Sequence, residues 1–529
     1  MSGVRISTSA DNSVAYINGR VYTVNKAKPW AEAFIVTPDG KFGIVGSTTE
    51  VLDKAKATGM VVQDLKAAFI MPGIHDAHVH SLQSGARILN WAELPEGTTL
   101  QQTPQRLAEC ACACQFQQAY QDWIVGATLH VDDYDRSVLD QDFPDRPVLL
   151  WGHGSHHRYL NTTALERAGY DIQNEPVPPY GEILRREDGS LTGELRGQAG
   201  DRASAAIPVP PMAHIKRIMQ RAVVELHKNG VTSCQDAAAS KVMLEALREL
   251  DSEGRLKMQF ATHILYKNAW LTGEVMSPPD KLILDSEKYR TTHVDTRFVK
   301  LMMDGVPAPP VFSHSELDAN GKPNMSKILL PDIDEVVEKF DAMGLTCKVH
   351  AMGHGGSTMT LDAFERVRRN NPNGPRHEIA HCSCILPDDF ARFKKLNVGA
   401  EMSPAGFFDY ESSGLDFPLI DWDFERMVAE GNHATIGSDW SYGMPLPILP
   451  AVAIVARKVG TEKTLEMITL AGARATNREK DAGSIETGKV ANFINVDRDL
   501  SKGGFKDAKV LRTWFEGELV FDGLKNVCG

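Results

Sequence analysis

The chain has 529 residues, of which 42% are hydrophobic and 24% charged, and its formal net charge at pH 7 is −12. This composition is typical of a globular protein, and the net negative charge argues against nucleic acid or an anionic membrane as the main partner. No apolar stretch is long enough to span a bilayer, and residues 1–12 are too polar for a signal peptide. We therefore expect a cytoplasmic protein whose eight cysteines are reduced.

Both ends of the chain have the pattern of β-hairpins. Within residues 1–72, pairs of short apolar segments flank the turn sequences Asn18-Gly19 and Pro38-Asp39-Gly40. Within residues 483–529, a similar pair flanks Glu516-Gly517. We predict that these two terminal segments join in one small β-sandwich domain.

Between the two ends, helical patterns alternate with short apolar strands, and a glycine follows each of the clearest helices. These helices are expected at residues 212–228, 333–343 and 424–430. Alternation of this kind is typical of a parallel sheet, and we predict an α/β fold with a TIM (β/α)₈ barrel over residues 73–482. Residues 90–206 break the rhythm, so we interpret them as an insertion after the first barrel strand that covers the active site.

The first expected barrel strand carries a histidine pair. An apolar run ends in Pro72-Gly73, and His78 and His80 follow one residue apart. Side chains alternate along a strand, so these two imidazoles point to the same side and suit a cation such as zinc. With seventeen histidines in the chain, such a pair occurs by chance in roughly half of similar sequences, so the motif needs support.

Four further residues fall at the ends of expected strands: Lys300, His350, His381 and Asp439. Lys300 is the only cation in the apolar segment 298–305, and burial of a free ammonium group is costly. A neutral lysine can add carbon dioxide to form a carbamate that bridges two metal ions. Each residue also has an ordinary alternative: a satisfied polar side chain for the histidines, an edge strand for Lys300, and a helix N-cap for Asp439.

Several motifs resemble those of the amidohydrolase superfamily and, within it, amidohydrolase family 3. They lie at residues 72–80, 139–148, 161–165, 300–305, 350–353, 377–381, 437–440 and 483–492. The resemblance covers nearly the whole chain and implies a TIM barrel with a terminal sandwich and metal-dependent hydrolysis. Two positions depart from the family, because His354 and Asn492 stand where it usually has aspartate.

The ligand set implied by this resemblance gives each residue a role. We expect His78 and His80 to bind one metal ion, His350 and His381 a second, and a carboxylated Lys300 to bridge them. Asp439 is expected to complete the metal site and to carry the proton, so that the predicted catalytic residues are Asp439, Lys300 and His350. Zn²⁺ is the expected cofactor, as one or two ions, with iron, manganese or nickel as alternatives. In the rival arrangement, one metal is bound and an unmodified Lys300 faces a carboxylate such as Asp304.

The expected reaction is hydrolysis of a carbon–nitrogen bond in an amide, N-acyl or N-formyl small molecule. The alternatives are a metal-dependent esterase or decarboxylase on the same fold, and a scaffold that has lost catalysis. The predicted substrate-binding residues are His156, Trp151, His153 and Trp440, and further candidates are His157, Phe312, His314 and Tyr442. We expect no nucleic-acid or membrane partner, and the sequence leaves a homodimer open.

Overall fold

The structure, a computed structural model, describes residues 12–525 apart from 96, 114–116, 132, 153–156, 179–180, 268–273, 275, 308–311, 408–421 and 442–445. At its centre is a parallel sheet of eight strands in the order β21-β20-β19-β18-β17-β16-β15-β8. Its strands are β8 (Ile74–Val79), β15 (Val231–Ala239), β16 (Gln259–Leu265), β17 (Val294–Met302), β18 (Thr346–Ala351), β19 (Glu378–His381), β20 (Gly399–Met402) and β21 (His433–Ile436).

Backbone hydrogen bonds bring the last barrel strand back to the first. The amide of Asp439 donates to the carbonyl of His78 (2.8 Å), and the amide of His80 donates to the carbonyl of Trp440 (2.9 Å). A parallel bridge between Val79 and Trp440 lies at the same point. The predicted TIM barrel is therefore confirmed, and the closure places two predicted metal ligands side by side.

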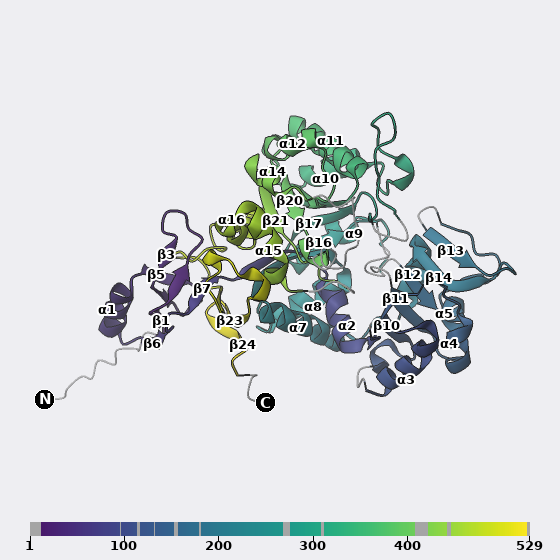
Figure 1. Cartoon of the computed structure of the whole chain (residues 1–529), viewed down its shortest axis with the longest axis horizontal. Coiled ribbons are helices and arrows are strands. Elements are labelled where there is room, and N and C mark those ends of the chain that lie inside the picture. The colour runs from purple at the N-terminus through teal and green to yellow at the C-terminus, as the bar shows by residue number, and fades with distance from the viewer. Residues whose placement is uncertain are drawn as a thin grey trace.

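Helices lie around the outside of this sheet (Figure 1). They include α2 (Ser81–Asn90), α7 (Met212–Lys228), α8 (Lys241–Ser252), α9 (Lys281–Leu284), α10 (Ile333–Ala342), α11 (His354–Asn370), α12 (Phe390–Lys395), α14 (Phe424–Ala429), α15 (Ile448–Val459), α16 (Thr461–Met467) and α17 (Leu470–Ala475). Helix α7 has the predicted bounds: its buried residues recur every three or four positions, and Gly230, with φ of 77°, follows its end. None of the helices in the described part of the chain is long and apolar enough to cross a membrane.

The two ends of the chain meet in one pair of packed sheets. One sheet joins β2 (Arg20–Tyr22), β3 (Trp30–Ala31) and β7 (Phe69–Pro72) to the C-terminal strands β22 (Phe493–Val496), β23 (Val510–Phe515) and β24 (Glu518–Asp522). The other contains β1 (Val14–Ile17), β4 (Ala33–Val36), β5 (Phe42–Gly46) and β6 (Val61–Asp64), and helix α1 (Thr48–Thr58) packs on it. A shared apolar cluster that includes Tyr16, Phe34, Phe493 and Trp514 fills the space between them.

The hairpin predicted at Asn18-Gly19 is wrong. Strand β1 before this turn pairs with β4 and β6, whereas β2 after it pairs with β3 and β7 in the other sheet. The amide of Gly19 donates to the carbonyl of Glu32 (2.7 Å), so the turn carries the chain from one sheet to the other. Long-range pairing thus overrides the local turn signal. The hairpins at Pro38-Asp39-Gly40 and Glu516-Gly517 are confirmed.

The aromatic contacts of Phe493 give a test of this domain. Its fully buried ring stacks on Trp514 with 4.5 Å between ring centroids and meets the ring of Tyr16 edge-on at 5.4 Å. We expect Phe493→Ala to lower the free energy of unfolding by about 3–5 kcal/mol, because it leaves a cavity between the two ends of the chain. Leu519→Ala on β24, where the side chain is 41% exposed, should change it by less than about 0.5 kcal/mol. Equal effects of the two substitutions on thermal unfolding would contradict this view of the core.

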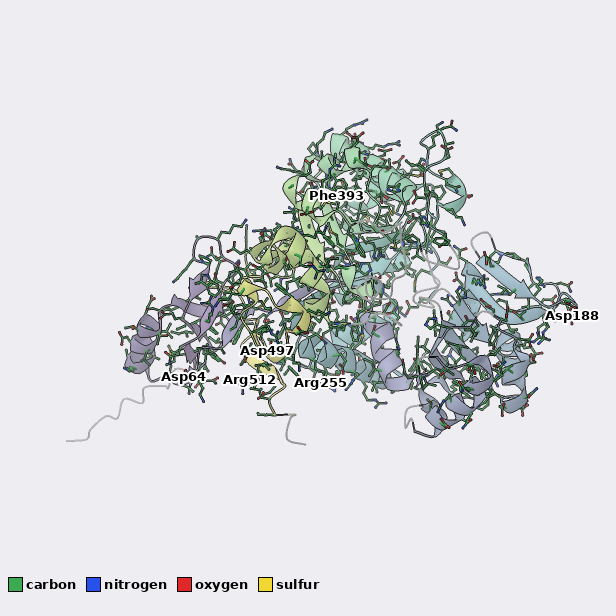
Figure 2. The ribbon with its side chains drawn as sticks, viewed as in Figure 1. Asp64, Asp188, Arg255, Phe393, Asp497 and Arg512 are labelled. Atoms are coloured by element: carbon green, nitrogen blue, oxygen red, sulfur yellow. The ribbon has the colours of Figure 1, made fainter. Side chains whose placement is uncertain are left out.

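The insertion has a sheet and a core of its own, and it lies on the side of the barrel opposite to the terminal sheets (Figure 1). It begins after helix α2 and returns to the barrel at α7. Its strands are β9 (Ala92–Glu93), β10 (Ile124–Leu129), β11 (Val148–Gly152), β12 (His157–Leu160), β13 (Gly181–Arg185) and β14 (Leu191–Gly197), and its helices are α3 (Thr103–Ala113), α4 (Ser137–Asp142), α5 (Thr162–Arg167) and α6 (Asp201–Ala206). Buried side chains of these elements form two apolar clusters, and Asp188, labelled in Figure 2, lies at the outer end of the domain.

Candidate metal centre

Three histidines and one aspartate converge at the carboxyl ends of the barrel strands. The Nε2 atoms of His80 and His78 lie 3.2 and 3.6 Å from Oδ1 of Asp439. Nδ1 of His381 lies 4.0 Å from Oδ2 of the same carboxylate. The structure therefore brings together His78 and His80 from the end of β8, His381 from the end of β19 and Asp439 from the segment after β21.

Lys300 and His350 stand beside this group. The amine of Lys300, which is 1% exposed, lies 3.5 Å from Nε2 of His78. The ring of His350 lies 4.7 Å from that of His381, measured between centroids, but its Nε2 is 3.0 Å from the carbonyl oxygen of Gly305. Among the described residues, two sets of three side chains here have ligand atoms within 4.8 Å of one another. One set is His78, His80 and Asp439, and the other is His78, His381 and Glu401.

Glu401 on β20 is a site residue that the sequence analysis missed. Its Oε2 lies 2.6 Å from Nδ1 of His78 and accepts the backbone N–H of His381 (3.2 Å), while Ser403 Oγ donates to Oε1 (2.5 Å). A carboxylate that accepts from Nδ1 of an imidazole leaves Nε2 as the free donor atom toward the site. A signal was available, because Glu401 is the only charged residue of strand β20.

The electrostatics of the centre favour neutral imidazoles. Burial lowers the pKa of His78 and His381 well below the usual value, and the nearby Lys300 acts in the same direction. Burial also lowers the pKa of Lys300 itself, with a further contribution from the charge of Lys348. Neutral imidazoles are the form that binds metal ions, and a neutral amine is the form that can be carboxylated.

Two of these imidazoles have nitrogen atoms without a hydrogen-bond partner in the described part of the chain: Nδ1 of His80 and Nδ1 of His381. Buried polar atoms are nearly always paired. The unpaired Nδ1 of His381 lies 4.0 Å from Oδ2 of Asp439, as the ligand atom of a metal site would, whereas His80 faces Asp439 through its other nitrogen, Nε2. The residues present therefore fit a metal ion.

The backbone is strained at two of the ligands. His381 has φ of 74° and Asp439 has φ of 51°, both in the left-handed region that non-glycine residues rarely adopt. Gly437 packs closely beside these ligands, because a Cβ there would lie 2.5 Å from Cβ of His78 and 2.6 Å from Oε1 of Glu401. Such strain persists where the surroundings fix it and is frequent at functional sites.

The rival arrangement with Asp304 beside Lys300 does not match the contacts of Asp304. Its carboxylate accepts the backbone N–H groups of Ser315, Met352 and Gly353, each at 2.9 Å. The carboxylates that act on Lys300 are instead those of Glu401, Asp439 and Glu378.

The predicted substrate-binding residues lie in different places. Trp440 is buried next to the centre, and its carbonyl accepts from the backbone of His80 and from Ser84 Oγ. Trp151 lies in the core of the insertion, where it stacks on Trp91 and the guanidinium of Arg158 lies 4.1 Å from its ring centroid. His153 and His156 lie outside the described residues, as does Tyr442. Substrate contact by these residues stays a prediction.

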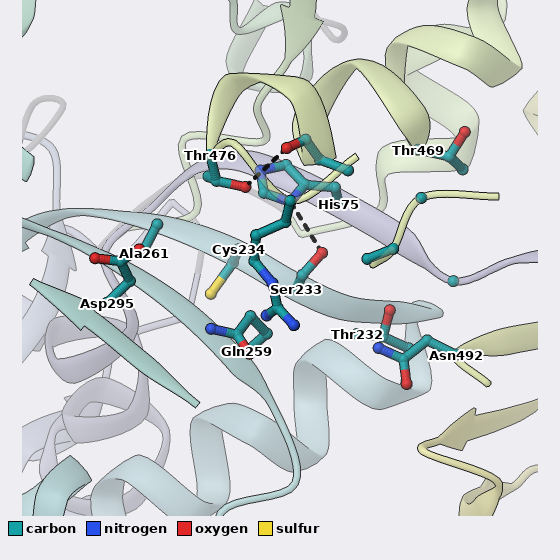
Figure 3. Close-up of a pocket in the computed structure, with 15 residues that line it drawn as sticks. His75, Thr232, Ser233, Cys234, Gln259, Ala261, Asp295, Thr469, Thr476 and Asn492 are labelled. Carbon is teal, nitrogen blue, oxygen red and sulfur yellow. Dashed lines mark hydrogen bonds between the residues drawn. The ribbon is translucent and has the colours of Figure 1, made fainter. Parts of the chain in front are cut away.

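A separate cavity lies at the opposite end of the barrel, toward the amino ends of β8, β15 and β16 (Figure 3). His75 lies there with Nδ1 2.9 Å from Ser233 Oγ, so this histidine of the first strand does not join the metal centre. The cavity volume of about 30 Å³ suits water molecules and not a substrate.

The contact between Glu401 and His78 leads to a prediction. We expect Glu401→Gln to weaken metal binding about 10- to 100-fold, because the acceptor that orients His78 loses its charge. Ser403→Ala, which removes only a donor to Glu401, should have a smaller effect. Titration with metal-buffered solutions measures both. Loss of a whole metal equivalent in the Gln variant would contradict the orienting role and make Glu401 itself a ligand.

The fold and the centre together define a class of protein: a TIM barrel with imidazoles and carboxylates at the carboxyl ends of its strands, suited to metal-assisted hydrolysis. Residues 61–521 match the amidohydrolase family, and the chain belongs to that family. This membership confirms the resemblance to amidohydrolase family 3 that the sequence motifs indicated, and it makes the chain a hydrolase of the amidohydrolase superfamily.

Individual relatives agree with this assignment over almost the whole chain. The chain is 25% identical to N-substituted formamide deformylase of Arthrobacter pascens, over 96% of this chain and 98% of that protein. It is 22% identical to a putative amidohydrolase, YtcJ, of Bacillus subtilis, over 95% of this chain and 98% of that protein. The structure of an uncharacterized metal-dependent hydrolase from Pyrococcus horikoshii has the same fold, with a TM-score of 0.74 and 20% identity over 94% of this chain and 99% of that one.

Proposed function

We propose that this protein uses a bound metal ion to hydrolyse a carbon–nitrogen bond in an amide, N-acyl or N-formyl group of a small molecule. One observation carries the proposal: the buried imidazoles of His78, His80 and His381 converge on the carboxylate of Asp439 at the carboxyl end of the barrel. The formamide deformylase among the relatives supports N-formyl compounds as the first substrates to test.

The residues that would hold the metal are His78, His80, His381 and Asp439. Lys300, if carboxylated, and His350 would complete a second position, so that one or two ions could bind. Imidazole and carboxylate ligands suit Zn²⁺, although other divalent metals accept the same set. When bound, the metal would supply a hydroxide nucleophile near neutral pH and polarise the scissile carbonyl group.

The chain's own residues would orient the site and move the proton. Glu401 accepts the Nδ1–H of His78 and thereby directs Nε2 toward the centre. Asp439 has a side chain that is 17% exposed, whereas that of Glu401 is fully buried, so Asp439 is the carboxylate of the centre that solvent can reach. Its carboxylate oxygens would take the proton of the attacking water and deliver it to the departing nitrogen.

A substrate screen tests this proposal. The zinc-loaded protein is incubated with N-formyl compounds, N-acyl amino acids, anilides and matched esters, and with His78→Ala as the control variant. We expect turnover of a formamide or N-acyl compound that a chelator abolishes and added Zn²⁺ restores. Turnover of esters alone, or turnover unaffected by the chelator, would contradict the proposal, and a chain without turnover or stoichiometric metal would be a scaffold.

A further inference from the structure

A second group of metal-binding side chain types lies at the same end of the barrel. Glu316, His354 and Cys384 each place one ligand atom within 4.8 Å of the others. His314 adds another imidazole, with Nε2 3.3 Å from Oε1 of Glu316. None of these residues belongs to the centre formed by His78, His80, His381 and Asp439.

The four residues come from segments next to those that build the first centre. His354 begins helix α11, four positions after His350, and Cys384 follows His381 by three positions. His314 and Glu316 lie in the segment that follows strand β17, which carries Lys300. The segments that follow the neighbouring strands β17, β18 and β19 therefore supply the second group, whereas Lys300, His350 and His381 lie within or at the end of those strands.

Buried contacts hold these segments together independently of any ligand. Asp304 accepts N–H groups from Ser315 on one side and from Met352 and Gly353 on the other. The carbonyl of Ser315 accepts the N–H of Gly355 at 2.8 Å. The backbone on either side of Glu316 and His354 is thus fixed, as a preorganised site requires.

The buried ring of His314 is incompletely paired. His314 is 7% exposed, and neither of its ring nitrogens has a hydrogen-bond partner among the described residues, although Nε2 faces Glu316. Nδ1 of His354 lies 2.7 Å from the other oxygen of Glu316, and Cys384 is 2% exposed. A network of ion pairs alone would leave Nδ1 of the buried His314 ring unpaired, which is uncommon.

We propose that His314, Glu316, His354 and Cys384 form a separate binding site for a transition-metal ion, best suited to Zn²⁺. Glu316, His354 and Cys384 place three ligand atoms within 4.8 Å of one another, and the imidazole of His314 beside Glu316 would supply the fourth. Imidazole, thiolate and carboxylate are the ligand types that tetrahedral zinc sites use. The imidazole of His354 stands where the family usually has aspartate, which makes the donor set softer and favours zinc over magnesium or calcium. The thiolate distinguishes this site from the first centre, where imidazoles and oxygens are the donors.

Cobalt substitution tests the site through that thiolate. The metal-free full chain is titrated with Co²⁺, and a near-ultraviolet charge-transfer band reports a cobalt–sulfur bond. We expect the band in the native protein and in Cys382→Ser, the matched control for a buried cysteine beside the first centre. We expect Cys384→Ser and His354→Gln to lose the band and to bind one fewer equivalent of cobalt per chain.

A His78→Ala variant separates this proposal from the function proposed above. It should lose metal from the first centre and keep the cobalt–thiolate band, so the two sites can fail independently. The inference is overturned if saturating Co²⁺ gives no thiolate band in the native protein, if the band persists in Cys384→Ser, or if it disappears in Cys382→Ser or His78→Ala. Equilibrium dialysis with Zn²⁺ provides the same count of equivalents for the native metal.

Discussion

Asparagine in place of Asp439 is expected to lower kcat by about 10²–10⁴-fold, the usual contribution of a positioned acid–base group. The physical reason is that asparagine keeps the size of the side chain but cannot accept the proton of the attacking water. The carboxylate of Asp439 lies 3.2 Å from His80 Nε2 and 3.6 Å from His78 Nε2, and its side chain is 17% exposed whereas that of Glu401 is fully buried. The measurement is kcat with the best amide from the substrate screen.

Metal content separates the two roles of Asp439. Because His78, His80 and His381 remain, we expect the Asp439→Asn variant to retain most of its metal when zinc is supplied. A variant that loses the metal entirely would show that Asp439 acts mainly as a ligand. A variant with full metal and more than a tenth of the native kcat would exclude Asp439 as the proton carrier.

The barrel could be predicted because its signals are local and repeated. At Gly230, Gly344 and Gly431 the backbone is left-handed, with φ of 77°, 73° and 72°, and each glycine separates a helix from the next strand. The turn at Asn18-Gly19 carries an equally strong local signal, yet its two strands belong to different sheets. A turn sequence specifies a bend, and only long-range pairing specifies the partners of the strands that follow.

The residues of the candidate site that lie at the ends of strands could be predicted from the sequence. His78 and His80 follow from the period of two along β8, and Asp439 follows from its place after β21. Glu401 was missed because a glutamate within a strand has no spacing motif, and its partner, His78, is 323 positions away in sequence. The group around Glu316 was missed for the same reason, since a loop, a helix start and a strand end meet there only in three dimensions.

Alanine in place of Lys300 is expected to abolish loading of a second metal ion, and short carboxylic acids should partly restore it. The amine of Lys300 is buried beside His78 Nε2 (3.5 Å), and burial lowers its pKa, so the neutral form that reacts with carbon dioxide is favoured. An ammonium group there would repel a bound cation, whereas a carbamate would attract it. Elemental analysis counts the metal ions, and labelling with ¹³C-bicarbonate reports the carbamate carbon by NMR.

Lys348 provides the matched control, because it is a second lysine buried inside the same barrel. Its amine donates to the carbonyl of Ala77 (2.5 Å) and lies 3.3 Å from Glu378 Oε2, so these two contacts already occupy it. Lys348→Met should destabilise the fold by about 3–5 kcal/mol, because Glu378 loses its cation, but added carboxylic acids should not change its metal content. If the native protein holds one metal ion and gives no carbamate signal, Lys300 is unmodified. Asp439 would then take its proton from water at that single ion.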